Sequence, residues 1–538
     1  MAGGRRAGDL ARRSRARSDA MSRLLLVMAL LAGCASKPPA PERTAPAASD
    51  AGVSDGGLAR TEAPPAGAEP QGTPDAPFRA QPPAPSAAIS FHAPVPRIAK
   101  LSNGLPVWIV EYHEVPLVTV DLVVKSGSDT EGPSQAGLAS FVLDALDEGT
   151  QTRDSVGIAR AFENLAARYR TEADADSSEV LVTALSSTLP EVLQIFADVA
   201  LHPAFRPADV ERVREQRLGQ IAQILDDPAQ VAERVLRRAI YGEKHPWAYP
   251  SEGTARSIAA LQPPTLMKWH ETWFRPNNAA LVVAGDVNGD ALLPLLEKSF
   301  GGWRPGKVPA ARTKAPASAG APRTVIVVDR PGAPQSQIFV GELGIESAAP
   351  DRFAARVMNL IFGGSFNSRL NINLRTEHGW SYGAFSFFEE HRQAGPFISE
   401  SGVMADHTAE ALSETFRELR RMQQGEVTDA ELSDAKESLL HTIPARFTSG
   451  ESVAELFARA FAHGLPPDYF ATYSQQVSAV SKEDVARAAR ERLHPDRAAI
   501  VVVGPLAETR KALGSLGLGA VEVRDAQGEA MQAKAPQQ

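Results

Sequence analysis

Short apolar segments and amphipathic segments alternate in an ordered way along the body of the chain. After residue 97, Val/Ile/Leu-rich segments of strand length come first, segments with helical periodicity follow, and a further apolar segment precedes a glycine. The predicted strands are 105–110, 117–124 and 279–284, and the predicted helices are 135–147, 155–169, 188–200 and 207–225. This order favours an α+β fold in which a sheet packs against helices.

The second half of the chain repeats this order. The predicted elements are strands at 324–328 and 337–342 and helices at 351–362, 406–423 and 428–443. Pro276 and Pro495 begin two ten-residue segments that match without a gap at an offset of 219 residues. The segments that begin at Asp209 and Glu431 match at an offset of 222 residues. Two matches at nearly the same offset indicate an internal duplication.

The N-terminus has the pattern of a targeting segment. Residues 1–20 are basic and polar, and the apolar stretch 24–31 is followed by a short run of small residues. This pattern predicts a signal peptide over residues 1–33, with either Met1 or Met21 as the start. The sequence LAGC, which ends at Cys34, resembles a bacterial lipobox, in which the cysteine becomes the acylated first residue of the mature chain.

The position of Cys34 decides the expected localisation. It is the single cysteine of the 538 residues, and the next residue is Ala35 rather than the aspartate that would favour retention in the inner membrane. We therefore predict a lipoprotein of the bacterial cell envelope that is anchored in the outer membrane and faces the periplasm. A single cysteine also excludes an intrachain disulfide and an all-cysteine zinc site.

Shifts in composition set the expected domain boundaries. Residues 34–93 are rich in Ala, Pro and Gly and contain too few large apolar residues to form a core, so they predict a disordered tether. A similar stretch predicts a linker at 306–322. The remaining expected parts are an N-terminal domain at 94–305, a C-terminal domain at 323–520 and a disordered tail at 521–538.

Charge and histidine spacing exclude several kinds of function. The net charge of -8 is opposite to that of a basic nucleic-acid-binding surface. No two of the 11 histidines lie within five residues of each other, so the zinc-binding patterns HExxH and HxxEH are both absent. The nucleophile motif G-x-S-x-G is also absent. The sequence therefore offers no ready-made hydrolytic centre.

One segment nevertheless resembles a zinc-binding helix. Residues 137–150 read GLASFVLDALDEGT, and the corresponding helix of active pitrilysin/insulinase-like (mitochondrial-processing-peptidase-like) metallopeptidases reads GLAHFLEHMLFKGT. The resemblance places the two ligand histidines of that family at Ser140 and Asp144 and its catalytic glutamate at Leu143. The third ligand of the family, a glutamate on a later helix, corresponds to Gln220. A leucine accepts no proton, and serine and glutamine are poor zinc ligands. We therefore predict no catalytic residue and no metal site in this chain.

A second resemblance concerns substrate binding. Residues 363–370 read GGSFNSRL and residues 374–383 read LRTEHGWSYG, similar to the family pattern GGxFxSRL…RExxGxxY. In that family the arginine and the tyrosine hold the substrate backbone across the chamber from the zinc. The resemblance assigns these substrate-binding roles to Arg375 and Tyr382. A guanidinium group and a phenol both donate hydrogen bonds to carbonyl oxygens.

Together the resemblances imply two duplicated pitrilysin-like domains, each with a mostly antiparallel sheet packed against helices. They also imply the non-catalytic subunit of a heterodimeric peptidase, which closes the chamber and binds peptide or unfolded protein for a partner subunit with HxxEH. The expected cofactor, zinc, would then lie in the partner and not in this chain. Two alternatives stay open, namely a scaffold lipoprotein without proteolysis and a self-sufficient hydrolase that uses Asp144 and scattered histidines.

Overall fold

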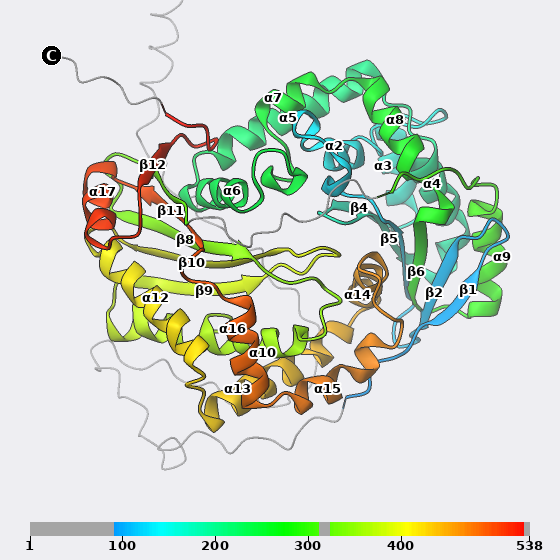
Figure 1. Cartoon of the computed structure of the whole chain (residues 1–538). Helices are drawn as coiled ribbons and strands as arrows, with labels where there is room; N and C mark the ends of the chain where they lie inside the picture. The colour runs from blue at the N-terminus through cyan, green and yellow to red at the C-terminus, as the bar shows by residue number, and fades with distance from the viewer. Residues whose placement is uncertain (1–90, 311–322, 532–538) are drawn as a thin grey trace, which may run out of the picture. The chain divides into compact units, whose positions relative to one another are not determined.

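The computed structural model describes residues 91–310 and 323–531, which contain two six-stranded β-sheets and their helices (Figure 1). The predicted signal peptide, Cys34 and the predicted tether as far as residue 90 lie outside the described residues, as do residues 311–322 of the predicted linker. Within the described ranges, no helix has both the length and the apolar character that crossing a bilayer requires.

The first sheet has the strand order β1-β2-β6-β3-β5-β4. Strands β2 and β6 are parallel, with Val107 opposite Leu281, and all other neighbours are antiparallel. Strand β6 reads AALVVAG and is buried along its whole length, because both faces of the sheet are covered. The strands are β1 Arg97–Lys100, β2 Pro106–Glu111, β3 Leu117–Val124, β4 Arg168–Ala173, β5 Ser178–Leu185 and β6 Ala279–Gly285.

Helices from the first half of the chain cover one face of this sheet. Phe141, Phe196 and Phe300 come from three different helices and fill the core beneath them. The helices are α2 Leu138–Asp144, α3 Ser155–Asn164, α4 Leu189–Leu201, α5 Pro207–Ile224, α6 Pro228–Tyr241, α7 Ala255–Ala260, α8 Pro263–Trp273 and α9 Gly289–Phe300. Among them, α6 does not join this layer.

The second sheet has the strand order β12-β7-β11-β8-β10-β9. Strands β12, β7 and β11 are parallel to one another, and β11, β8, β10 and β9 pair in antiparallel fashion. The strands are β7 Val325–Asp329, β8 Gln335–Leu343, β9 Ser381–Phe388, β10 Pro396–Met404, β11 Ala499–Gly504 and β12 Val521–Arg524. The order matches that of the first sheet, with β7, β11, β8, β10 and β9 in the places of β2, β6, β3, β5 and β4. This correspondence confirms the predicted duplication.

The helices of the second half also form a layer on one face of their sheet. Phe353, Phe362 and Phe416 lie in the core between this layer and the strands. The helices are α10 Arg352–Phe362, α11 Arg369–Asn371, α12 Thr408–Gln424, α13 Asp429–Thr442, α14 Gly450–Ala462, α15 Tyr469–Ala479, α16 Lys482–Arg492 and α17 Leu506–Ser515.

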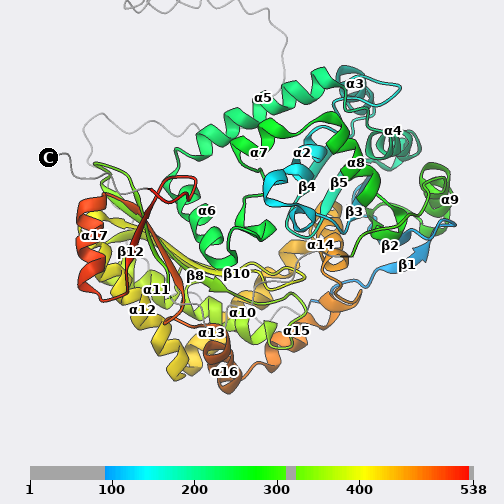
Figure 2. The same cartoon turned by 45° about the horizontal axis from the view of Figure 1, so that its top comes forward.

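The two halves exchange one helix each. Helix α14 belongs to the second half but packs against β3 and β6 of the first sheet, where Phe457 meets Trp108 at a ring-centroid distance of 6.3 Å (Figure 2). Helix α6 belongs to the first half but packs against β8 and β11 of the second sheet, where Leu236 lies in a cluster with Phe339 and Val501. Each sheet is therefore covered on its second face by a helix from the other half.

The predicted α+β architecture with two mostly antiparallel sheets is confirmed, but several expectations are wrong in detail. The helix expected at 155–169 ends at Asn164, and strand β4 follows it. The segment 521–538 does not begin as a disordered tail, because β12 pairs with β7 over residues 521–524. Helix α6, which lies within the range expected for the N-terminal domain, packs on the sheet of the C-terminal domain.

Candidate functional site

Helix α2 carries the residues that resemble a zinc-binding helix. It is short, and it begins after Gly137, whose φ of 86° lies in the left-handed region. A Cβ atom at this glycine would lie 2.7 Å from the backbone of Gly253, so a larger residue does not fit. Leu143, which replaces the catalytic glutamate, is only 1% exposed and packs in the core.

A buried carboxyl group holds the start of α2. Glu131 accepts hydrogen bonds from the backbone N–H groups of Gly137 at 2.8 Å and Ala139 at 2.6 Å. Burial raises the pKa of Glu131 to about 8, although both hydrogen bonds act in the opposite direction. This contact satisfies N–H groups that a helix start leaves without partners. The frame of the helix is thus fixed independently of any metal.

An arginine joins the two positions at which the resemblance places the ligand histidines. Arg217 of α5 forms an ion pair with Asp144 and donates a hydrogen bond to Ser140 Oγ at 2.9 Å. It also donates to the carbonyl oxygen of Glu252 at 3.0 Å, and only 7% of its side chain is exposed. Burial raises the pKa of Asp144, and the positive charge of Arg217 partly offsets this effect. A fixed guanidinium cation therefore binds both positions.

The fourth replaced position lies on the same helix as this arginine. Gln220 follows Arg217 by three residues on α5 and is exposed. The structure thus brings Ser140 and Asp144 together through Arg217, directs Leu143 into the core and leaves Gln220 in solvent. The sequence analysis missed Arg217. A basic residue one helical turn before the third ligand position was the only available signal.

The second-half motif forms a turn that lies tightly against strand β9. Ser386 of β9 donates its backbone N–H to the carbonyl oxygen of Gly363 at 2.9 Å. A Cβ atom at Gly363 would lie 2.5 Å from Ser386 Oγ, which explains the glycine at this position. Ala384 of the same strand donates to Asn371 Oδ1 at 3.0 Å. The GGSFNSRL segment and the asparagine that follows it are therefore each held to β9 by one hydrogen bond.

Arg369 of this motif has a structural role. Its guanidinium binds both carboxylate oxygens of Glu431, with distances of 2.6 and 2.9 Å. Glu431 also closes the capping box at the start of α13 with Thr428. Burial alone would raise the pKa of Glu431, but hydrogen bonds from Arg369 and Thr428 outweigh it and lower the pKa to about 2. The motif is thereby tied to α13.

The two predicted substrate-binding residues lie on neighbouring elements. Arg375 is half-buried in the π-helix η7, Ile372–Glu377, and its guanidinium lies 4.3 Å from the ring centre of Phe366. Tyr382 is 88% exposed on β9, an edge strand of the second sheet. Its hydroxyl makes no hydrogen bond to any described residue. Both side chains are thus available for a ligand.

Further exposed apolar side chains lie on the same elements as this pair and on the turn before them. Besides Tyr382, they are Phe366, Ile372 and Phe385, which lie on η7, on β9 and on the preceding turn. We call these four residues with Arg375 the aromatic edge. Exposed aromatic rings, a guanidinium group and an unpaired strand edge together offer the contacts that an extended peptide uses.

Two family descriptions match the chain. Residues 107–250 match Insulinase (Peptidase family M16), and residues 260–439 match Peptidase M16 inactive domain. The duplicated fold and the helix α2 segment agree with these matches. The chain therefore belongs to the insulinase family of peptidases.

The names of the relatives differ, because some describe a protease and another describes a protein without peptidase activity. An uncharacterized zinc protease of Mycobacterium tuberculosis is 28% identical over 363 residues, which cover 67% of this chain and 81% of that protein. The protein of Helicobacter pylori called non-peptidase homolog YmxG is 24% identical over 388 residues, covering 71% of this chain and 87% of the relative. Sequence similarity alone therefore does not assign proteolysis.

Solved structures support the fold. The peptidase M16 inactive domain from Pseudomonas fluorescens superimposes with a TM-score of 0.71 at 25% identity, and the match covers 76% of this chain and 98% of that one. A protease from Helicobacter pylori gives a TM-score of 0.71 at 22% identity, covering 76% and 100% of the two chains.

Proposed function

We propose that this chain is the non-catalytic subunit of a zinc-dependent peptidase of the insulinase family. It closes the chamber and binds peptide or unfolded protein through Arg375 and Tyr382, while a partner subunit of the same family supplies HxxEH and zinc. The Arg217 contacts carry this proposal. The guanidinium group of Arg217 binds both Asp144 and Ser140 and places a fixed positive charge between the two positions, which opposes a metal cation there, and it cannot itself activate water.

The aromatic edge supports the binding role. The exposed hydroxyl of Tyr382 and the guanidinium of Arg375 are free to donate hydrogen bonds to the carbonyl oxygens of a bound peptide. The flanking apolar side chains can cover its side chains. Arg375 and Tyr382 would hold the carbonyl group of a bound peptide in a fixed orientation for hydrolysis by the partner, whose zinc would supply the Lewis acid, and positioning of this kind contributes several kcal/mol to catalysis.

The test is a peptidase assay of this chain combined with a partner chain that carries HxxEH. Arg375→Ala and Tyr382→Phe should each lower kcat/KM of the pair, by about 10²–10³-fold where the lost donor acts on developing charge. Tyr382→Phe keeps the ring and therefore tests the hydroxyl group alone. Arg160→Ala and Tyr112→Phe are matched controls away from the aromatic edge, and they should leave kcat/KM unchanged.

A different result would favour the scaffold alternative. If both Arg375→Ala and Tyr382→Phe leave an active pair with full kcat/KM, the chain contributes no substrate contact through these residues. A variant that fails to assemble with the partner would lower kcat/KM for that reason alone. Pair formation is therefore measured separately by size-exclusion chromatography. Normal assembly together with reduced kcat/KM is the result that the proposal requires.

We also propose that Cys34 is acylated and anchors the protein in the outer membrane on its periplasmic side. Cys34→Ser should then move the protein from the membrane fraction to the soluble fraction of the cell envelope, as measured by fractionation and immunoblotting. The net charge of -8 offers little attraction to anionic lipid as a substitute. If the variant still sediments with membranes in high salt, the anchor lies elsewhere.

A further inference from the structure

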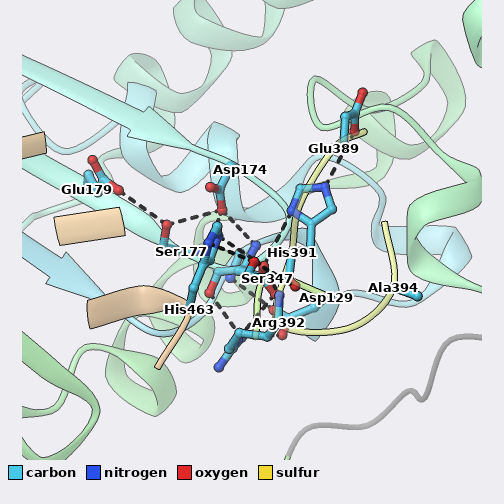
Figure 3. Close-up of polar contacts among 12 residues, drawn as sticks. Asp129, Asp174, Ser177, Glu179, Ser347, Glu389, His391, Arg392, Ala394 and His463 are labelled. Carbon is cyan, nitrogen blue, oxygen red and sulfur yellow. Dashed lines mark hydrogen bonds and ion pairs between the residues drawn. The ribbon is translucent and has the colours of Figure 1, made fainter. Parts of the chain in front are cut away.

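Two histidines and one aspartate that are far apart in the sequence meet between the two halves of the molecule. Asp176 lies in the β4–β5 turn, His391 lies between β9 and β10, and His463 directly follows α14. Their ligand atoms, one from each residue, all lie within 4.8 Å of one another. The close-up in Figure 3 shows the rings of His391 and His463 and the polar side chains around them.

Each histidine directs one unpaired nitrogen toward the same carboxylate oxygen. His391 Nδ1 lies 3.4 Å from Asp176 Oδ2, and His463 Nε2 lies 3.5 Å from the same atom. Both nitrogens are buried, and neither forms a hydrogen bond with any described residue. The side chains of Asp176 and His463 are 1% and 6% exposed. Buried polar atoms normally have partners, so two unpaired nitrogens beside one oxygen require an explanation.

The distances fit a shared metal ion better than a shared proton. Charge-assisted N–H···O hydrogen bonds measure about 2.7–2.9 Å, which is clearly shorter than 3.4 and 3.5 Å. In a tetrahedral zinc site with metal–ligand bonds of about 2.0–2.1 Å, neighbouring ligand atoms are roughly 3.3–3.4 Å apart. The two observed nitrogen–oxygen separations are close to this tetrahedral edge, and all three ligand atoms lie within 4.8 Å of one another.

The opposite nitrogen of each imidazole ring has a neighbour that orients it. His463 Nδ1 is hydrogen-bonded to Ser347 Oγ at 2.9 Å, and Ser347 Oγ in turn donates to the carbonyl oxygen of His391 at 2.8 Å. His391 Nε2 faces Glu389 Oε2 at 3.4 Å. Because Ser347 gives its proton to that carbonyl group, it accepts from His463 Nδ1, and the lone pair of His463 Nε2 then points toward Asp176. Metal-binding histidines are typically held by such carboxylate and hydroxyl neighbours.

The surroundings are rich in negative charge. Asp129 and Asp176 both form ion pairs with Arg392, at 2.7 and 3.2 Å. Asp174 lies two residues from Asp176 and binds the N–H groups of the turn. A divalent cation in this position would balance the excess of carboxylates.

We propose that Asp176, His391 and His463 form a zinc-binding site that joins the two halves of the chain. Imidazole nitrogen and carboxylate oxygen are ligands that suit Zn²⁺, and three protein ligands leave a fourth position for water. His391 and His463 also line a cavity of about 570 Å³. None of these three residues lies on helix α2. The sequence predicts no metal site in this chain, and with this proposal that prediction applies only to the positions on α2.

The test measures zinc in the purified full chain, expressed without a histidine tag, by inductively coupled plasma mass spectrometry. After equilibration with ZnCl₂ and removal of loosely bound metal, the wild type should retain one zinc per chain, and His391→Ala and His463→Ala should retain none. His202→Ala removes an exposed histidine and should keep the zinc. Asp144→Asn should keep it as well, because that residue belongs to α2.

A milder variant tests the site even if the histidine-to-alanine variants misfold. Ser347→Ala removes only the hydroxyl group that orients His463, and it should weaken zinc affinity about 10–100-fold in a competition with a chromophoric chelator. Added zinc should raise the Tm of the wild type and have no such effect on a folded His463→Ala variant. The inference is overturned if the wild type retains no stoichiometric zinc, or if folded His391→Ala and His463→Ala variants retain it.

Discussion

At the scale of single residues, the decisive feature is the guanidinium group of Arg217, which binds Asp144 and Ser140. Zinc polarises a carbonyl group and generates hydroxide near neutral pH, whereas a guanidinium group keeps its proton and only donates hydrogen bonds. Arg217 satisfies Asp144 and Ser140 without offering any reactive centre. The positions at which the resemblance places the zinc ligands are thus part of the structural framework of the first half.

Arg217→Ala should lower the free energy of unfolding by about 2–3 kcal/mol, because it removes a buried guanidinium group and leaves the Asp144 carboxylate partly buried without a partner. Arg212→Ala on the same helix is the matched control. The side chain of Arg212 is 44% exposed, against 7% for Arg217, so the loss of its ion pair with Glu148 should cost less than about 1 kcal/mol. Urea denaturation monitored by circular dichroism measures both. Equal effects of the two variants would contradict the structural role of Arg217.

At the scale of elements, the segment that leads to the proposed substrate-binding residues is attached to α13. The turn before η7 holds its position through the Arg369–Glu431 ion pair, and the same carboxylate caps α13. An ionised Glu431 therefore stabilises two elements at once. Its lowered pKa makes this contribution dependent on pH.

The direction of that dependence follows from the two pKa values. The pKa of Glu431 is about 2 in the folded chain and 4.5 ordinarily, so the stabilisation is complete above about pH 4.5 and is lost as the pH falls toward 2. Glu431→Gln should lower the free energy of unfolding by about 1–2 kcal/mol at pH 7, and its difference from the wild type should shrink by more than half at about pH 3.

Thermal unfolding at a series of pH values provides this measurement. Glu271→Gln, on the exposed face of α8, is the control and should show no such trend. A difference between Glu431→Gln and the wild type that stays constant from pH 7 to pH 3 would mean that the charge of Glu431 does not stabilise the fold.

At the scale of the whole molecule, the exchange of α6 and α14 makes the halves dependent on each other. The second face of the first sheet exposes Trp108, Val110 and Val282 unless α14 covers them. An uncovered apolar sheet face of this kind drives aggregation. The two sequence repeats are therefore not two independent folding units.

Residues 91–310 expressed alone should aggregate, and coexpression with residues 323–531 should yield a soluble complex on size-exclusion chromatography. Phe457→Ala in the second fragment should weaken the complex, because Phe457 packs against Trp108 and large aromatic-to-alanine changes in a core cost about 3–5 kcal/mol. A soluble, folded 91–310 fragment without its partner fragment would show that α14 is dispensable for the first half.

The sequence predicted the features that depend on local pattern. Strand β6 and helix α5 were placed within one or two residues, because a fully buried strand is uniformly apolar and Pro207 begins the helix. Strand β4 is not predicted, and the helix expected at 155–169 covers its first two residues, because its sequence RYRTEA is that of a polar edge strand. It lacks the apolar run by which the other strands are predicted.

The pattern of hydrophobic and polar positions does not predict contacts between residues that are far apart in the sequence. The resemblance located Ser140 and Asp144, yet nothing in the local sequence pairs them with Arg217, 73 residues after Asp144. An amphipathic helix such as α6 shows that it has an apolar face but not which sheet that face will cover. The same limit applies to Asp176, His391 and His463, whose spacing in the sequence matches no metal-binding motif.

The central claim is that this chain has no hydrolytic centre of its own, and a peptidase assay with zinc present tests it most directly. The purified chain alone should not cleave unfolded protein, its combination with an HxxEH-bearing partner should do so, and replacing the partner's motif glutamate by glutamine should abolish that activity. Chelator-sensitive cleavage by this chain alone, lost in its Asp144→Asn variant, would contradict the account.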